Sequence, residues 1–231
     1  MDITWIGHAT FLIRSGKTAI LTDPWFGRSL FYRRLRPPAM EADEISCCDI
    51  VLVSHAHGDH IDGKGLELAG RLGSLVVGPP SVVKKAEKTG IRYEAAEPGK
   101  TINAAGVQIM VTPACHPAPG AKDAVGYILK IEEKAVYFAG DTLLFPELVD
   151  MLKDGVDLAI LPIGPYKLLG RKVGMDVSEA LKLVEETKPR AVVPMHYNCL
   201  KGTEADPDFL LKADGGTTRI FLMAPGETLF F

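Results

Sequence analysis

The stretch VLVSHAHGDHIDG, residues 51–63, places three histidines and two aspartates directly behind four residues that are typical of a buried strand. Imidazole nitrogens and carboxylate oxygens are common ligands of divalent transition metals. Loop histidines held by hydrogen bonds and a purely structural zinc site are the alternatives, but structural zinc sites usually have four ligands and favour cysteine. We therefore expect a functional metal site where this strand ends.

The spacing within the motif suits two metal ions. On extended backbone His55 and His57 project to the same side, about 7 Å apart, so both rings can reach one ion. Gly58 allows a sharp turn that can direct Asp59 and His60 to the other side, where a second ion would sit. The motif therefore predicts a loop that serves two ions.

The composition is that of an ordinary globular protein. Its 231 residues are 47% hydrophobic and 24% charged, enough for one sizeable core, and no linker or repeat divides the chain. We expect a single domain over residues 1–231. The formal net charge of -3 gives no global attraction to nucleic acid or an anionic membrane surface, so such partners would need a local patch. We expect a small-molecule substrate rather than nucleic acid, and the sequence leaves a homo-oligomer open.

Targeting and membrane signals are missing from this sequence. No apolar stretch approaches the roughly 20 residues of a membrane-spanning helix, and the N-terminus lacks the layout of a signal peptide. The four cysteines contain no CxxC pair, so we expect reduced thiols rather than disulfides or a cysteine zinc site. These observations predict a cytoplasmic protein without a membrane span.

Apolar runs separated by turn residues predict a series of strands, several of which are continuous enough to be covered on both faces. The clearest helix is 177–187, with a capping box at Asp176 and Glu179 and a stop at Lys188–Pro189. Such a pattern indicates an α/β protein with outer helices over inner sheets. The predicted strands are 3–13, 19–22, 49–54, 74–78, 107–112, 125–131, 135–140, 157–163, 191–195 and 219–223, and weaker helices are 81–89, 145–153 and 207–213.

Further metal ligands are expected at the ends of other strands, where open sheets place their sites. Three residues qualify. His116 follows the strand-like stretch VQIMVTPAC, Asp141 follows AVYFAG, and His196 follows AVVPM. Taken singly, either histidine is better explained as an ordinary loop residue, but together with the 51–63 motif they form a consistent set.

The order HAHGDH, His116, AGDT and PMHYN resembles the metallo-β-lactamase superfamily. The opening WIGHATFLI, the TDPW at 22–25 and the closing PMHYN look like its small single-domain metal-dependent hydrolases, related to ascorbate-phosphate lactonases and N-acylphosphatidylethanolamine-type phospholipases D. The segment 164–180 is longer and more basic than the glycine-rich turn of many relatives.

This resemblance implies a four-layer αββα sandwich with its site at one edge. It also implies two divalent ions, for which zinc is our first choice and manganese or iron the alternatives. The implied ligands are His55, His57 and His116 for the first ion and Asp59, His60 and His196 for the second, with Asp141 bridging them.

Two ions about 3.5 to 4 Å apart can share a water, lower its pKa and present it as a bridging hydroxide to an electrophile. Asp59 or Asp141 would orient that hydroxide and relay its proton, and the sequence does not decide between them. We therefore expect a hydrolase of an ester-like bond, a lactone, phosphodiester or thioester, in a small anionic substrate.

Four further residues are candidates for supporting roles. His8 has no ligand position left to fill, so it is either a core histidine or a contact to the ligands or substrate. Asp23 could accept a proton from a metal-bound imidazole, or it is a turn residue before a proline. Arg33 and Arg34 belong to the basic segment 27–38, which is either a rim that holds an anionic or lipid-like substrate or a solvated loop.

Three other functions compete with the hydrolase. A nuclease of the same superfamily would want a broad basic surface and an inserted RNA-clamping domain, and no such insertion is visible. A diiron redox protein of this fold would typically carry a carboxylate where His57 stands. A non-enzymatic metal-binding protein would be expected to have lost some of the seven ligands.

Overall fold

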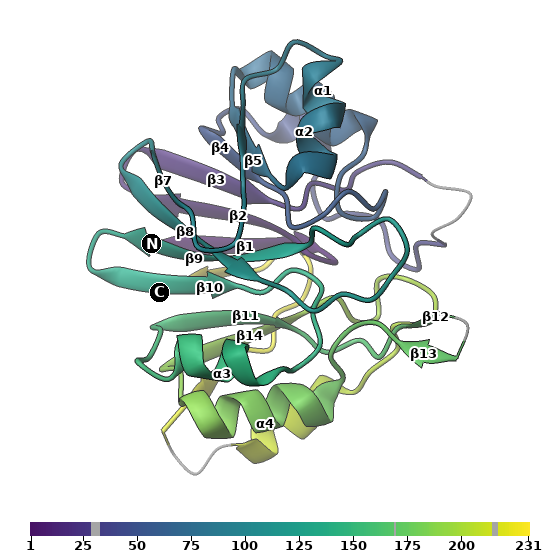
Figure 1. Cartoon of the computed structure of the whole chain (residues 1–231), viewed down its shortest axis with the longest axis vertical. Helices are drawn as coiled ribbons and strands as arrows, with labels where there is room; N and C mark the ends of the chain where they lie inside the picture. The colour runs from purple at the N-terminus through teal and green to yellow at the C-terminus, as the bar shows by residue number, and fades with distance from the viewer. Residues whose placement is uncertain (29–32, 169, 214–216) are drawn as a thin grey trace.

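Two seven-stranded sheets form the centre of the molecule in this computed structural model, which describes residues 1–28, 33–168, 170–213 and 217–231 (Figure 1). The first sheet has the strand order β16 (Thr228–Phe230), β1 (Asp2–Gly7), β2 (Thr10–Ser15), β3 (Thr18–Thr22), β4 (Ile50–Leu52), β5 (Leu75–Gly78) and β6 (Tyr93–Ala95). The second has the order β15 (Arg219–Ile220), β14 (Ala191–Met195), β11 (Leu158–Pro162), β10 (Lys134–Phe138), β9 (Val125–Ile131), β8 (Val107–Pro113) and β7 (Thr101–Ala104).

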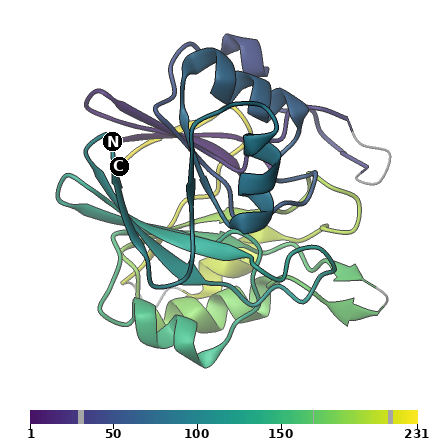
Figure 2. The same ribbon diagram turned by 45° about the horizontal axis from the view of Figure 1, so that its top comes forward.

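Helices cover the outer face of each sheet, which gives the four-layer α/β arrangement (Figures 1 and 2). On the first sheet these are α1 (Gly63–Leu72) and α2 (Pro80–Glu87), and on the second they are α3 (Pro146–Leu152) and α4 (Val177–Thr187). The 3-10 helices η1 (Ala42–Glu44) and η2 (Pro207–Ala213) and the short hairpin of β12 (Lys167–Leu168) and β13 (Arg171–Lys172) complete the elements.

Alternation along β2 shows how the sequence builds these layers. Phe11 and Ile13 belong to the large apolar cluster shared with the second sheet, whereas Leu12 belongs to the cluster beneath α1 and α2. Successive side chains of a strand point to opposite faces. A strand with apolar residues at every position is therefore buried on both sides, as the continuous apolar runs predicted.

Most of the predicted elements are present, and the differences are local. The run 3–13 is split by a turn at His8 and Ala9 into β1 and β2, the run 219–223 pairs only over Arg219–Ile220, and 207–213 is a 3-10 helix. Helix 177–187 has the predicted bounds. Its Asp176 side chain accepts a hydrogen bond from Glu179 N at 3.0 Å, but the Glu179 carboxylate pairs with Lys172 at 3.1 Å.

Strand direction brings the predicted site residues to one edge. In the first sheet β3 runs parallel to β4, and β1 is antiparallel to β2, which is antiparallel to β3, so β1, β3 and β4 end on the same side. The same reasoning applies to β8, β10 and β14 in the second sheet. The predicted metal ligands, together with His8 and Asp23, all follow these six strands.

None of the helices in the described part of the chain combines the length and apolar character needed to cross a bilayer. The four cysteines are free thiols.

Candidate metal centre

The loop after β4 divides its ligands between two clusters. A tight turn holds the loop, because the carbonyl oxygen of His57 accepts hydrogen bonds from the backbone N–H groups of His60 at 3.1 Å and Ile61 at 3.0 Å. His55 and His57 group with His116, and Asp59 and His60 group with His196, while the rings of His55 and His60 have centres 4.0 Å apart. The division of these residues between two ions stays a prediction.

His55, His57 and His116 form the first cluster. The Nε2 atom of His55 lies 2.9 Å from Nδ1 of His57, and Nε2 of His116 lies 3.5 Å from that same Nδ1. Ligand nitrogens around a tetrahedral zinc ion are about 3.3 Å apart, given zinc–nitrogen bonds of about 2.0–2.1 Å. The three nitrogens therefore converge at a spacing that suits one ion.

Carbonyl groups behind the first cluster orient two of its rings. Nε2 of His57 donates a hydrogen bond to the carbonyl oxygen of Pro119 at 2.9 Å, and Nδ1 of His116 donates to the carbonyl oxygen of Val173 at 2.6 Å. Because a carbonyl oxygen only accepts, these nitrogens carry the protons. The opposite nitrogens, which face the cluster, keep their lone pairs for a metal.

Asp23, at the end of β3, orients one histidine in each cluster. Its Oδ2 accepts hydrogen bonds from His60 Nδ1 and from Ser54 Oγ, both at 2.7 Å, and its Oδ1 accepts one from Ser54 N at 2.7 Å. Ser54 Oγ is then the acceptor for His55 Nδ1 at 3.0 Å. The Nε2 atoms of His55 and His60 are thereby left for a metal, as the supporting role predicted for Asp23 requires.

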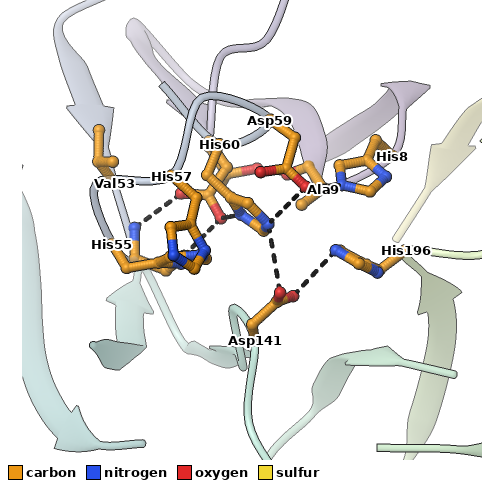
Figure 3. A network of polar contacts seen from close by, with 12 residues as sticks. His8, Ala9, Val53, His55, His57, Asp59, His60, Asp141 and His196 are labelled. Carbon is orange, nitrogen blue, oxygen red and sulfur yellow. Dashed lines mark hydrogen bonds and ion pairs between the residues drawn. The ribbon is translucent and has the colours of Figure 1, made fainter. Parts of the chain in front are cut away.

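Asp59, His60 and His196 form the second cluster, and Asp141 lies between the two clusters (Figure 3). Its Oδ1 is 3.2 Å from Nε2 of His196, and its Oδ2 is 3.4 Å from Nε2 of His60 and 3.9 Å from Nε2 of His116. Because the last of these nitrogens belongs to the first cluster, Asp141 is close to both clusters. The bridging role that the family resemblance implies for it stays a prediction.

Two buried carboxylates of this site, Asp59 and Asp141, are held in the charged form. Burial raises the pKa of Asp141, but His196 and His60 outweigh it and hold that pKa well below its usual range. Burial also raises the pKa of Asp59, yet the nearby His60 and His8 lower it to about 2. Both carboxylates are therefore available as anionic ligands at neutral pH.

The pKa values of two histidines of the site, His55 and His60, shift in opposite directions. Burial and the neighbouring His60 lower the pKa of His55 well below its usual value. Burial acts on His60 in the same direction, but Asp141, Asp23 and Asp59 outweigh it and raise its pKa well above the usual value. In the metal-free protein His60 thus keeps a proton that a metal ion would have to displace.

Several buried polar atoms of the site make no hydrogen bond of acceptable geometry within the described residues. Such atoms are rare in folded proteins because each loses its water without a replacement. Divalent cations would satisfy them, and the imidazole and carboxylate donors fit zinc, manganese or iron. The atoms are both ring nitrogens of His8, Oδ1 of Asp59, Nε2 of His60, Oδ1 of Asp141 and Nε2 of His196.

A cavity of about 130 Å³ opens onto these residues. Its wall includes His57, Asp59 and Asp141 on the metal side and the less polar Tyr166 and Leu168 from the segment around β12 on the other. A larger cavity of about 500 Å³ lies between η1 and α1, and none of its lining residues belongs to a group of potential metal ligands. The smaller one is therefore the candidate for substrate.

The arginines of segment 27–38 do not line this cavity where the structure describes them. Arg34 lies 3.4 Å above the centre of the Trp25 ring and donates a hydrogen bond to the Trp25 carbonyl oxygen at 2.6 Å. Burial lowers its pKa to about 10. Arg33 is exposed, and its predicted contact with substrate stays a prediction; residues 29–32 of the segment lie outside the described residues.

Comparison with known proteins identifies the family. Residues 18–197 match the Beta-lactamase superfamily domain. A UPF0173 metal-dependent hydrolase of Thermococcus onnurineus is 36% identical over 237 residues, and one of Pyrococcus abyssi is 35% identical over 243 residues, each with 99% of both chains covered. The chain belongs to the metallo-β-lactamase superfamily. Within it, the chain is a member of the UPF0173 metal-dependent hydrolase family.

Several solved structures share this fold. A metallo hydrolase from the archaeon Ignicoccus hospitalis has a TM-score of 0.82 at 30% identity, covering 99% of this chain and 97% of that chain. An isothiocyanate hydrolase from Delia radicum gut bacteria has a TM-score of 0.84 at 19% identity, covering 100% and 99%. The diiron β-hydroxylase CmlA of Streptomyces venezuelae has a TM-score of 0.80 at 17% identity, covering 100% and 54%. At the last two identities the likeness shows the fold alone.

His8 contacts the residues of this site, which is one of the two alternatives that the sequence left open for it. His8 is buried at the turn between β1 and β2, and its ring joins Asp59, His60 and His196 in one group of potential ligands. The signal for it was present in GHAT, where a histidine interrupts an otherwise apolar run. With the known ligand positions already filled, sequence reasoning gave no ground to add it to them.

Proposed function

We propose that the protein is a dinuclear metal-dependent hydrolase that cleaves an ester-like bond, a lactone, phosphodiester or thioester, in a small anionic substrate. One observation carries this proposal. Seven buried or half-buried side chains, spread from residue 55 to residue 196, fall into overlapping groups of potential metal ligands. The groups are His55, His57 and His116; His55, His60 and Asp141; and Asp59, His60 and His196 together with His8. The Asp141 carboxylate also lies within 3.2–3.9 Å of His60, His116 and His196. Zinc is the first choice of metal, with manganese and iron as alternatives.

When bound, two divalent ions would supply a nucleophile by lowering the pKa of a shared water, and they would polarise the bond to be cleaved. Asp141 would hold the two halves of the site together, since both of its oxygens face histidines. Asp59 and Asp141 are both candidates for the proton relay, because both line the cavity and the Oδ1 of each has no hydrogen-bond partner among the described residues.

Charge near the cavity supports an anionic substrate. Lys167 of β12 and Arg171 of β13 are exposed, and they flank Tyr166 and Leu168, which line the cavity. Lys172 is neutralised by Asp176 and Glu179. The two exposed cations would attract a carboxylate or phosphate to the rim, while the small volume near the metals favours a small reacting group.

The experiment that tests this function combines metal counting with hydrolysis. The purified protein, loaded with Zn²⁺ or Mn²⁺, is expected to bind about two ions per chain and to hydrolyse at least one of a generic lactone, phosphodiester and thioester. Asp141→Asn is expected to lose both properties. Asp150→Asn, an exposed α3 aspartate paired only with Lys153 at 3.0 Å among the described residues, is the matched control.

Each result separates the hydrolase from its rivals. A protein that binds two ions but leaves all three substrates intact would favour a non-enzymatic metal-binding role. Cleavage of RNA or DNA in preference to the small substrates would favour a nuclease. Equal activity of Asp141→Asn and Asp150→Asn would contradict the proposed site.

A further inference from the structure

His8 is held rigidly at the tip of the β1–β2 hairpin. Its φ of 56° is in the left-handed region, where residues other than glycine are uncommon. Its backbone N–H donates a hydrogen bond to Cys199 Sγ at 3.3 Å, and its carbonyl oxygen accepts one from His196 N at 3.1 Å. The fold thus fixes His8 directly against a predicted ligand of the second ion.

The ring of His8 faces the second cluster, as Figure 3 shows beside Asp59 and His196. Its Nε2 lies 3.5 Å from Oδ2 of Asp59, and its ring centre lies 3.9 Å from that of His196 and 5.4 Å from that of His60. The potential ligand atoms of all four residues lie within 4.8 Å of one another. This spacing is as compact as that of the residues already assigned to the second ion.

A purely structural role for His8 does not explain why two polar ring nitrogens are buried there. His8 is fully buried, and neither of its ring nitrogens makes a hydrogen bond of acceptable geometry in the described part of the chain. The edge of Trp25 packs against the ring, with centres 5.0 Å apart, but offers it no acceptor. A phenylalanine would fill such an apolar place without the cost of burying two polar atoms.

We propose that His8 is an additional ligand of the second metal ion, binding through Nε2 beside Asp59, His60 and His196. This inference rests on the dinuclear centre proposed above. It makes all six histidines of the chain metal ligands. With Asp141 bridging, the second ion would have five protein ligands and the first only four, so the first ion would have more room for a substrate oxygen.

Nuclear magnetic resonance of the unaltered protein tests this directly. The protein is labelled with ¹⁵N in its histidines alone and titrated with Zn²⁺, because a zinc-bound ring nitrogen has a shift distinct from that of a free or protonated one. At two equivalents, six histidines are expected to show a zinc-bound nitrogen, with His8 changing together with His60 and His196. Five bound histidines and an unbound His8 would overturn the inference while leaving the dinuclear site intact. No bound histidine would instead contradict the proposed function itself.

Variants give a second measurement. His8→Asn tolerates the left-handed backbone but lacks the ring nitrogen, so competition with a chelator is expected to show at least about tenfold weaker binding of the second Zn²⁺ equivalent. Binding of the first equivalent should be unchanged. Trp25→Phe keeps an aromatic ring against His8 and removes no ligand, so it should bind both equivalents normally. Unchanged binding in His8→Asn, or an equal loss in Trp25→Phe, would overturn the inference.

Discussion

Asp23 and His60 form a fully buried pair in which the Oδ2 of the carboxylate accepts a hydrogen bond from Nδ1 of the imidazole at 2.7 Å. The residues are 37 positions apart in the chain, at the ends of neighbouring parallel strands. This contact fixes which nitrogen of His60 faces the second cluster. Asp23 therefore positions a metal ligand without itself reaching the proposed ion.

Replacing the Asp23 carboxylate should weaken the binding of the second metal ion. In Asp23→Asn the amide carries no charge to hold the Nδ1 proton of His60, so we expect the affinity for the second metal equivalent to fall about 10- to 100-fold. Chelator competition measures this. Asp150→Asn is the control, and an Asp23→Asn protein that binds the second equivalent as tightly as that control would contradict the positioning role.

Metal binding should release protons and depend on pH. The pKa of His60 is raised well above its usual value in the metal-free protein by Asp141, Asp23 and Asp59 against the effect of burial. At neutral pH the second ion must therefore displace a proton, so affinity should increase as the pH rises toward that raised pKa. Titration calorimetry at pH 7 in buffers of different ionisation enthalpy would show the proton release. A binding enthalpy that does not depend on the buffer would exclude proton release.

The Asp23–His60 pair should make the metal-free protein less stable to unfolding at high pH. Because the pKa of His60 is raised in the folded state, its contribution to the free energy of unfolding is fully present below about pH 6.5, the usual histidine pKa. It is lost as the pH rises through the raised folded value. Denaturant unfolding of the metal-free protein across this range should show the decrease, and added metal should abolish it by displacing the proton.

Gly140 is expected to tolerate no side chain. It precedes Asp141 at φ +58°, and a Cβ there would overlap the Cβ of Ser54 and lie 2.8 Å from its Oγ. Gly140→Ala should therefore lower the free energy of unfolding by about 1–3 kcal/mol beyond backbone strain and reduce metal content. Gly155→Ala is the matched control, since Gly155 also has a left-handed φ of +89° but nothing within 4 Å of a Cβ. Equal losses in both variants would show that the clash with Ser54 has no effect.

The exposed cations of the β12–β13 hairpin should affect anionic substrates selectively. Replacing both Lys167 and Arg171 by alanine is expected to lower kcat/KM about tenfold for an anionic ester at low salt, and less at high salt, because exposed charges are screened. A neutral ester should be little affected. Lys182→Ala, an exposed lysine of α4, is the control. Equal effects on both esters would remove the support for an anionic substrate.

The location of the site could be predicted from sequence because two local rules agree. The HAHGDH motif follows an apolar strand, and His116, Asp141 and His196 each follow another, so strand ends that share one edge had to meet. Continuous apolar runs likewise predicted strands buried on both faces. The predicted bounds of these strands differ from the observed ones by a few residues at most, apart from 3–13 and 219–223.

Features that depend on long-range packing could not be predicted. Helix α1 contains Gly63, Gly65 and Gly70, which weaken its helical signal, yet Gly65 is needed because a Cβ there would lie 2.5 Å from the carbonyl oxygen of Pro24. The ring of His8 reaches the second cluster only because the β1–β2 turn folds against His196. Likewise, the stacking of Arg34 on Trp25 depends on a contact that no local pattern encodes.

Anomalous diffraction from crystals of the protein grown with Zn²⁺ or Mn²⁺ tests the two-metal arrangement most directly. Our account predicts two peaks per chain, one among His55, His57 and His116 and the other among Asp59, His60 and His196, with Asp141 contacting both. A single peak, or a pair of peaks that leaves Asp141 or His196 uncoordinated, would contradict it.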